Sequence, residues 1–459
     1  MLAITDFKYV YFLGIGGIGM SALARWFSVN GFMVAGYDRT PTLLTEQLQQ
    51  EGVLVHFDDD VAQIPALFKE NIGQTLVIYT PAIPKNHSEY NFLISNNFTI
   101  QKRAQVLGLL AGGMFTLAVA GTHGKTTTSA MIAHLLRHSG VNCAAFLGGI
   151  TQNYNTNLLI NEPTDDLKKV FCVVEADEFD RSFLTLFPNI AVVTSTDADH
   201  LDIYGSHESV LESFGAFVSQ IKPSGHFFMR HGLSLANKTQ AIVSQYALDA
   251  GDYHAQNLRI ENACFVFDMV YPNGVIADIN MQLPGFHNVE NAVAATAVGL
   301  AVGLSATQIK AGLETFGGVK RRFEYYLKTE QKVLIDDYAH HPAEVEAFLS
   351  SVKALYPNRH VTAIFQPHLF TRTRDFAADF AKSLSIADRL ILLEIYPARE
   401  LPLEGVTSNL IFEEVSCDKT SCLKSELLEI IKNSQIDVVV TIGAGDIDKY
   451  IEPIKQLLL

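Results

Sequence analysis

The feature that most constrains this fold is a repeated alternation of short apolar runs with helical segments along a chain of 459 residues. The first apolar runs are YVYFL, MVAGY and TLVIY, with a helical segment at 21–29 between the first two. Many later runs are apolar throughout, which is typical of parallel strands that helices cover on both faces. The alternation predicts an α/β fold made of βαβ units.

Glycine pairs divide the alternation into three series. The second series contains FTLAVAGTHGKTTT, KVFCVVEADE and NIAVVTSTDADH, and the third contains KVLIDDYAHH, HVTAIFQPHLF, RLILLEIYP and DVVVTIGAGD. The pairs at 112–113 and 317–318 lie between successive series. We therefore predict domains at 1–112, 113–316 and 317–459, in agreement with the roughly 150 residues of an average domain.

The composition argues against polymeric and membrane partners. Lys and Arg total 34 against 49 Asp and Glu, which gives a formal net charge of −15. We therefore expect no binding to nucleic acid or to an anionic membrane surface. Five scattered cysteines form no CxxC pair, and the N-terminus lacks the basic and apolar regions of a signal peptide. Both features predict a cytoplasmic protein.

One window, at 104–124, has no Lys, Arg, Asp or Glu and is long enough to cross a membrane. A glycine pair interrupts it in the middle, and a Gly-Lys loop begins at its end. We therefore expect a helix, a turn and a buried strand here, with no membrane insertion.

A first glycine-rich loop follows the first apolar run and opens a helix. It has the form GxGxxG, in which glycines permit a tight turn and let backbone N–H groups approach a diphosphate at the positive end of the helix. Asp38 ends the next run, about 20 residues on, where a ribose-binding acid lies in dinucleotide folds. The loop alone is compatible with NAD, FAD, another diphosphate-bearing nucleotide or a structural turn. Its residues are Gly14, Ile15, Gly16, Gly17, Ile18 and Gly19.

A second glycine-rich loop lies between the run FTLAVA and a helical segment at 126–138. Backbone N–H groups of such a loop surround phosphates, the lysine neutralises the β- and γ-phosphates, and the following threonine offers a hydroxyl to Mg²⁺. The loop is shorter than GxxxxGK[ST], because Val119 stands where that pattern has its first glycine. Strand, loop, lysine and helix still follow in the required order, so we predict phosphate binding. The residues are Gly121, Thr122, His123, Gly124, Lys125, Thr126 and Thr127.

Acidic residues follow two apolar runs of the same series. Glu175-Ala-Asp-Glu178 follows KVFCVV, and a segment with His200, DADHLD, follows NIAVVTST. Ligands gather outside the carboxyl ends of parallel strands, so both clusters would face the second loop. Carboxylates and an imidazole in that place predict divalent metal sites, and helix caps or turns are the alternative for any one residue.

Polar residues also crowd strand ends later in the chain. GFHNVEN precedes a small-residue helix, RRF lies at the second predicted boundary, and DDYAHH and QPHLFTRTR follow apolar runs. Paired arginines suit a carboxylate or a phosphate. The adjacent His340 and His341 suit metal binding, acid–base chemistry or a structural role.

Taken in order, GIGGIGMS, GTHGKTTT, EADEFD, DHLD, GFHNVEN, RRF and DDYAHHP resemble the motifs of the Mur ligase family along nearly the whole chain. The resemblance implies an N-terminal Rossmann-like domain, a central P-loop ATPase-like parallel sheet and a C-terminal Rossmann-like domain. It also implies an ATP-dependent, ADP-forming ligase of cytoplasmic peptidoglycan precursor synthesis. This ligase would join L-alanine to the lactyl carboxylate of UDP-N-acetylmuramate through an acyl phosphate. The segment QPHLFTRTRD favours that activity over reattachment of a recycled murein tripeptide to the same nucleotide sugar.

The resemblance also implies roles for individual residues. The first loop, Gly14 to Gly19, would hold the diphosphate of the UDP-sugar, and Lys125 and His200 would be catalytic. The ligands of Mg²⁺, or of Mn²⁺, would be Thr126, Glu175 and His200. ATP would contact the second loop together with Asn291, Arg322 and Asp337. The amino acid or the lactyl carboxylate would contact His341, Arg372 and Arg374.

Some positions depart from the residues usual in the family. Ser195 replaces an asparagine before the DHxD segment, and Leu369 replaces an arginine after QPH. Between His200 and Lys222 the chain has no lysine, although several relatives carry a carbamylated lysine downstream of the metal-binding histidine. The base for the incoming amine is also open, with His341 and His123 as candidates because an imidazole titrates near neutral pH.

Two other classes of function compete with this interpretation. An NAD-dependent oxidoreductase would explain the first loop and leave the second without a purpose. A regulatory P-loop NTPase would hydrolyse ATP without any amino acid. As a ligase, the protein is expected to act as a monomer or a homodimer.

Overall fold

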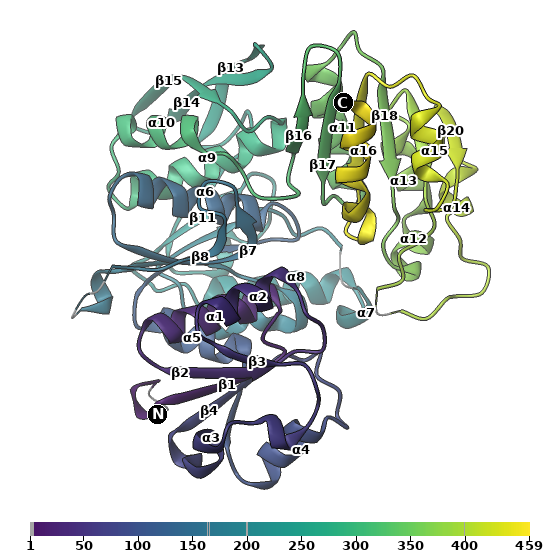
Figure 1. Cartoon of the computed structure of the whole chain (residues 1–459). Coiled ribbons are helices and arrows are strands. Elements are labelled where there is room, and N and C mark those ends of the chain that lie inside the picture. Colours follow the sequence, from purple (N-terminus) through teal and green to yellow (C-terminus); the bar gives the residue numbers. More distant parts are fainter. Residues whose placement is uncertain (1–3, 163, 165, 199–200, 399) are drawn as a thin grey trace. The chain divides into compact units, whose positions relative to one another are not determined.

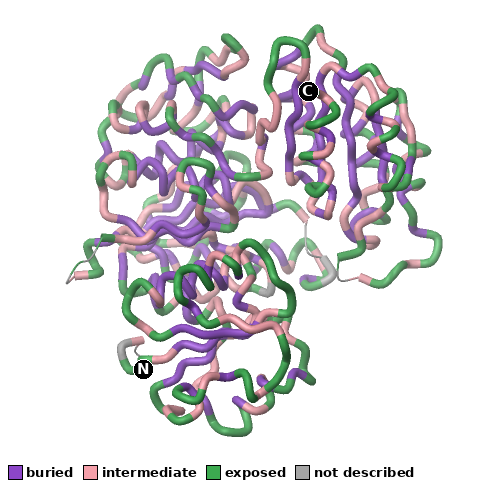
Figure 2. Tube along the Cα trace, viewed as in Figure 1, coloured by how far each residue is buried: buried purple, intermediate pink, exposed green. Residues whose placement is uncertain are grey.

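The computed structural model of the protein describes residues 4–162, 164, 166–198, 201–398 and 400–459. The chain divides into two compact units. In both units the strands are mostly buried, while the helices expose one side (Figure 2). The predicted α/β class is confirmed, whereas the domain boundaries near 112 and 316 stay predictions. The first unit is Met1–Tyr253 with Val293–Gly312, and the second is His254–Ala292 with Leu313–Leu459.

The first unit begins with strands that alternate with helices. These elements are β1 (Tyr9–Leu13), α1 (Ile18–Val29), β2 (Met33–Tyr37), α2 (Leu43–Gln50), β3 (Leu54–His56), α3 (Ala66–Glu70), β4 (Thr75–Tyr79), α4 (Ser88–Ser95), β5 (Thr99–Lys102) and α5 (Arg103–Gly112). The strands form a parallel sheet in the order β3-β2-β1-β4-β5. Val10 and Phe12 pack on the side of α1, α2 and α5, whereas Tyr11 and Leu13 pack on the side of α3 and α4 (Figure 1). Burial on both faces explains the continuous apolar runs.

A second sheet of this unit carries the second glycine-rich loop. Its elements are β6 (Phe115–Ala120), α6 (Lys125–His138), β7 (Cys143–Thr151), β8 (Thr156–Leu159), β9 (Phe171–Glu175), the 3-10 segment η5 (Phe179–Thr185), β10 (Ile190–Val193), α7 (Leu201–Tyr204), α8 (His207–Ser219), β11 (His226–Arg230) and β12 (Ile242–Tyr246). Over the described residues the strand order is β12-β11-β10-β6-β9-β7-β8, and every pair is parallel except β7 with β8. The carboxyl end of β6 therefore lies between those of β9 and β10.

The uncharged window at 104–124 forms the helix, turn and strand that its glycines predict. Helix α5 ends at Gly112, and β6 runs from Phe115 to Ala120 directly before the loop. Among the helices that the structure describes, none is both long enough and apolar enough to cross a membrane.

A side chain of the second sheet holds the first long helix of the chain. Asn157 on β8 is fully buried, and its Nδ2 donates to the carbonyl oxygen of Ile18 in the first turn of α1 at 2.5 Å. Its Oδ1 accepts from Nη1 of Arg25 on the same helix at 3.5 Å. Helix α1 therefore contacts β1 and β2 of its own sheet as well as β7 and β8 of the next.

The second unit contains an antiparallel sheet that the alternation does not predict. It consists of β13 (His254–Glu261), β14 (Cys264–Tyr271) and β15 (Gly274–Met281), paired in that order. Exposed residues interrupt the buried ones along β13 and β15. These strands therefore lack the continuous apolar run that marks a parallel strand covered on both faces, and the expectation of βαβ units was incomplete.

A mainly parallel sheet forms most of the rest of the second unit, and the helical residues Val293–Gly312 that precede it in the chain belong to the first unit. After α9 (Phe286–Ala301) and α10 (Ala306–Thr315) come β16 (Glu324–Lys328), β17 (Val333–Asp337), α11 (Pro342–Leu355), β18 (Val361–Phe365), α12 (Phe370–Asp375), α13 (Ala377–Leu384), β19 (Arg389–Leu392), α14 (Asn409–Phe412), β20 (Asp418–Ser421), α15 (Leu427–Lys432), β21 (Val438–Ile442) and α16 (Ile451–Leu458). The strand order is β16-β17-β21-β18-β19-β20, with β16 antiparallel to β17. The predicted polar residues after β17 and β18 thus lie at one edge of the sheet.

Candidate active site

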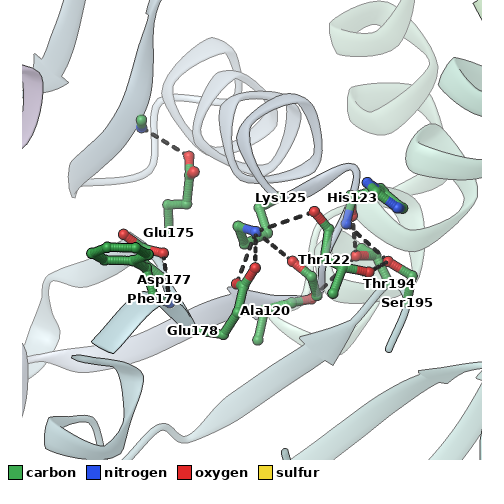
Figure 3. Close-up of polar contacts among 12 residues, drawn as sticks. Ala120, Thr122, His123, Lys125, Glu175, Asp177, Glu178, Phe179, Thr194 and Ser195 are labelled. Carbon is green, nitrogen blue, oxygen red and sulfur yellow. Dashed lines mark hydrogen bonds and ion pairs between the residues drawn. The ribbon is translucent and has the colours of Figure 1, made fainter. Parts of the chain in front are cut away.

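The second loop is a tight link between β6 and α6 (Figure 3). Gly121 and Gly124 have φ angles of +138° and +78°, which lie in the left-handed region that favours glycine. A Cβ added to Gly121 would lie 2.0 Å from Oγ1 of Thr194. The turn and the close approach of β10 therefore both require glycine at 121.

Hydroxyl groups at the end of β10 hold the second loop from the side (Figure 3). Ser195 Oγ lies 2.8 Å from Thr122 Oγ1 and accepts from the backbone N–H of His123 at 2.9 Å. Thr194 Oγ1 donates to the carbonyl oxygens of Ala120 and His123. Ser195 is one of the departures from the usual family residues, and in this chain it helps to fix the shape of the loop.

Lys125 is the first residue of α6 and lies against its own loop. Its Nζ donates to the carbonyl oxygen of Gly121 at 2.5 Å and lies 2.9 and 2.8 Å from the two carboxylate oxygens of Glu178. Burial disfavours the charged ammonium, but the carboxylates of Glu178, Asp177 and Glu175 outweigh burial and raise the pKa of Lys125. The lysine is therefore charged at neutral pH, as neutralisation of a phosphate requires.

Thr126 and Glu175 bring two oxygen ligands together beside the loop. Thr126 Oγ1 donates to Glu175 Oε1 at 3.0 Å, and Glu175 Oε2 accepts from the N–H of Gly148 at 2.8 Å. Burial raises the pKa of Glu175. A cation bound nearby would lower this pKa and favour the ionised carboxylate. A hydroxyl and a carboxylate are hard ligands that suit Mg²⁺. His200, the third predicted ligand, lies outside the described residues, so the predicted set of three stays a prediction.

The acidic cluster after β10 also reaches the second loop. The N–H of Asp197 donates to Thr122 Oγ1 at 3.1 Å, and Asp197 Oδ2 lies 3.4 Å from Nε2 of His123. Thr127 is buried in the first turn of α6. The structure therefore places parts of both acidic clusters around the loop, as their positions after β9 and β10 predict.

The first loop, Gly14 to Gly19, is held by hydrogen bonds from its backbone N–H groups to Tyr37 and Asp38. The N–H groups of Gly14 and Ile15 donate to the carbonyl oxygen of Tyr37 at 2.8 and 2.9 Å. The N–H of Gly16 donates to Asp38 Oδ2 at 2.7 Å. Asp38, considered as a ribose-binding acid from the dinucleotide pattern, thus fixes the loop itself.

In the second unit, two residues predicted to contact ATP lie at the same end of the antiparallel pair β16 and β17: Arg322 just before β16 and Asp337 at the end of β17. Asp337 accepts from the N–H groups of Phe323 and Ala339, each at 2.8 Å. Burial raises the pKa of Asp337 to about 7, although the charge of Arg322 opposes this rise. The Arg322 guanidinium carbon lies 5.1 Å from the ring centre of Tyr338. This unit therefore presents a cation, an aromatic ring and a buried carboxyl group at one edge of its sheet.

Three further predicted residues of the second unit are buried. Asn291 lies on α9 and is 9% exposed. His341 precedes α11, and its Nδ1 accepts from the N–H of Ala343 at 3.4 Å. Arg372 lies on α12 with Nη1 3.5 Å from Nδ1 of His368. For His341, the structure shows a helix-capping role, which the sequence left open as a structural alternative.

The start of α12 contains the other family departure. Leu369 is buried and has a φ of +71°, a strained value for a branched side chain. Arg374, predicted with Arg372 to contact a carboxylate, has a 53% exposed side chain paired with Asp375 at 2.7 Å. The structure thus fixes Arg372 more firmly than Arg374.

Three family profiles match the chain in succession. They are described as "Mur ligase family, catalytic domain" at 9–114, "Mur ligase middle domain" at 119–299 and "Mur ligase, glutamate ligase domain" at 321–445. A curated UDP-N-acetylmuramate--L-alanine ligase of Parabacteroides distasonis is 50% identical over 453 residues, which are 98% of this chain and 97% of the relative. The protein of the same name from Phocaeicola vulgatus is 49% identical over 99% of each chain. The chain therefore belongs to the Mur ligase family.

Solved structures share the fold. The UDP-N-acetylmuramate-alanine ligase of Thermotoga maritima has a TM-score of 0.78 and 26% identity over 98% of each chain. A murein peptide ligase of Psychrobacter arcticus has a TM-score of 0.68 and 22% identity over 98% of each chain, a likeness that shows the fold alone. The predicted family, fold class and enzyme class, a ligase, are confirmed.

Two charged residues reach the loops in ways that the sequence predictions did not assign: Glu178 was named only as part of an acidic cluster for metal binding, and Arg103 was not named. Glu178 pairs with Lys125, and its place in the EADE cluster after β9 was a signal. Arg103 lies in no motif, and its contact with the first loop joins helices that are far apart in the sequence. The roles predicted for the other residues stay predictions.

Proposed function

We propose that the protein joins L-alanine to the lactyl carboxylate of UDP-N-acetylmuramate in an ATP-dependent reaction. The observation that carries this proposal is about 50% identity along the full chain to curated UDP-N-acetylmuramate--L-alanine ligases. The fold supports it, because the first unit has two glycine-rich loops at the carboxyl ends of two parallel sheets. The UDP-sugar would occupy the first loop and ATP the second. The cofactor of an NAD-dependent oxidoreductase would occupy the first loop and leave the second without a ligand.

The reaction has two steps. The γ-phosphoryl group of ATP passes to an oxygen of the carboxylate, which gives an acyl phosphate and ADP. The amine of L-alanine then attacks the acyl carbon, the phosphate leaves, and an amide forms. Phosphoryl transfer needs positioning and charge neutralisation more than covalent chemistry from the protein. The charged, partly buried Lys125 and the N–H groups of its loop would supply both.

The residues beside the second loop fit a divalent cation. Thr126 and Glu175 would hold Mg²⁺ or Mn²⁺, with His200 as the further ligand inferred from the family resemblance. When bound, the ion would supply charge stabilisation for the transferring phosphoryl group. The second loop would bind ATP with Asn291, Arg322 and Asp337, and His341, Arg372 and Arg374 would contact the amino acid or the carboxylate.

We also propose one task for each predicted domain. The segment 1–112 would hold the UDP-sugar, 113–316 would hold ATP, and 317–459 would bring the amino acid. The three matched family profiles begin and end near these boundaries, which supports the division. A cytoplasmic location is part of the proposal, and the five free cysteines are consistent with it.

The test is ADP release by the full chain with ATP, Mg²⁺ and UDP-N-acetylmuramate. L-alanine, L-serine, glycine and the murein tripeptide are added in turn. We expect ADP release to need both the UDP-sugar and L-alanine. Release with the tripeptide instead of L-alanine would assign the recycling activity. Release without any amino compound would assign a regulatory NTPase, and either result would refute the proposal.

A further inference from the structure

Arg103 lies directly against the first loop. A Cβ placed on Gly19 would lie 2.4 Å from Arg103 Nη1 and 3.3 Å from its Cδ and Cζ atoms. Gly19 is part of α1, and its φ is not in the left-handed region. Its backbone therefore does not require glycine, and the missing side chain provides the space for the guanidinium group.

The helix that carries Arg103 is fixed in place. Gly108 of α5 packs so closely on η5 that an added Cβ would lie 2.5 Å from the carbonyl oxygen of Thr185. Thr185 Oγ1 in turn donates to the carbonyl oxygen of Ala104 at 2.8 Å. On its other side, Arg103 Nη2 lies 3.8 Å from Asp177 Oδ2, just after β9. The guanidinium thus lies between the first loop and the acidic end of β9.

The charges around Arg103 favour an anionic ligand. A cation next to the first turn of a helix is unfavourable by itself, because that turn carries a partial positive charge. Asp177 compensates weakly, since its side chain is 41% exposed and the two groups are 3.8 Å apart. Gly17, the N-cap of α1, has no side chain with which to cap the helix. A phosphate oxygen at this turn would accept from both the backbone N–H groups and the guanidinium.

We propose that Arg103 binds the diphosphate of the UDP-sugar, as a side-chain contact beside the backbone amides of the first loop. This inference rests on the proposed function, which places the diphosphate there. The planar guanidinium matches two phosphate oxygens at once, whereas a lysine would keep the charge and lose that geometry.

The test is calorimetric binding of UDP, UDP-N-acetylglucosamine and UDP-N-acetylmuramate to the full chain without ATP. Arg103→Gln is expected to weaken all three by about tenfold to hundredfold, the effect of losing a charge-assisted hydrogen bond. Arg103→Lys should weaken them less. Lys102→Gln is the matched control, because it removes the same charge at the exposed neighbouring position, and it should bind like the wild type. Binding of ATP should not change in any variant.

The outcomes separate this inference from the proposed function. Wild-type affinity in Arg103→Gln, or in Arg103→Lys should the glutamine variant not fold, would refute the contact. A loss confined to UDP-N-acetylmuramate would place Arg103 on the lactyl carboxylate and would also refute it. A wild-type protein that bound none of the three compounds would refute the proposed function and the inference together, whereas binding of UDP unaffected by position 103 refutes the inference alone.

Discussion

The two glycine-rich loops of the first unit share a strand–loop–helix pattern but are held by different chemistry. In the first loop, backbone N–H groups donate to the carbonyl of Tyr37 and the carboxylate of Asp38. In the second, hydroxyls just after β10 hold the loop, and the ion pair of the partly buried Lys125 with the buried Glu178 lies at its end. The comparison shows that groups at the ends of the neighbouring strands hold the two loops in different ways, by a carbonyl and a carboxylate in the first and by hydroxyls in the second.

Replacing Lys125 should affect the second loop alone and give the largest effect on activity. Lys125→Ala is expected to lower kcat by about a thousandfold, roughly 4 kcal/mol, because one preorganised cation is lost from the site of phosphoryl transfer. Binding of UDP-N-acetylmuramate should stay unchanged. Steady-state ADP release and calorimetry measure the two quantities. Lys169→Ala removes an equal charge from a side chain that is 81% exposed and serves as the control. Near-normal turnover in Lys125→Ala would contradict the assignment.

Replacing one glycine of each loop by alanine should show which loop tolerates an added methyl group. Gly121→Ala puts Cβ 2.0 Å from Thr194 Oγ1 on a backbone with φ of +138°. We expect a loss of roughly 3–5 kcal/mol in the free energy of unfolding, from strain and overpacking together. Gly19→Ala meets only the flexible end of Arg103 within a helix, so its change should stay within about 1 kcal/mol. Denaturant unfolding of both variants gives the comparison, and equal losses would contradict it.

The last prediction is the pH dependence of stability, and it concerns the surroundings of the first loop. That loop rests on Tyr37, whose ring centre lies 4.5 Å from that of His87, just before α4. On α4, the fully buried Glu89 accepts from the Tyr11 hydroxyl at 2.6 Å. Burial raises the pKa of Glu89 from 4.5 to about 7. Lys125 at the second loop has a raised pKa and keeps its charge over this range.

Because the folded pKa of Glu89 lies above the unfolded one, its stabilising contribution is complete below pH 4.5 and is lost as the pH rises through about 7. The free energy of unfolding should therefore fall by up to about 3 kcal/mol between these values. In Glu89→Gln, the free energy of unfolding should not show this decrease with pH. In Glu46→Gln, which changes an exposed glutamate, the decrease should remain. Urea unfolding from pH 4.5 to 8 measures the difference, and identical pH profiles in wild type and Glu89→Gln would contradict the role of Glu89.

Much of the fold could be predicted because burial on both faces leaves a clear mark on a strand. The apolar runs 171–174 and 333–335 form most of β9 and β17. Strand β15 is half-exposed and carries no such mark. The closeness of Lys125 and Glu175 could be predicted, because Lys125 follows the loop after β6 and Glu175 ends β9. The carboxyl ends of these adjacent parallel strands lie side by side. The contact of Arg103 with Gly19 could not be predicted, because it depends on how two helices pack.

One buried amide has a mechanical consequence. Asn157 on β8 holds both the Ile18 carbonyl and the Arg25 guanidinium, so α1 cannot turn about its axis without pulling on the sheet that carries the second loop. The helix that follows the first loop and the sheet that carries the second loop are therefore joined by one buried side chain. Under the proposed function, this side chain would tie the loop for the UDP-sugar to the sheet whose loop binds the phosphates of ATP.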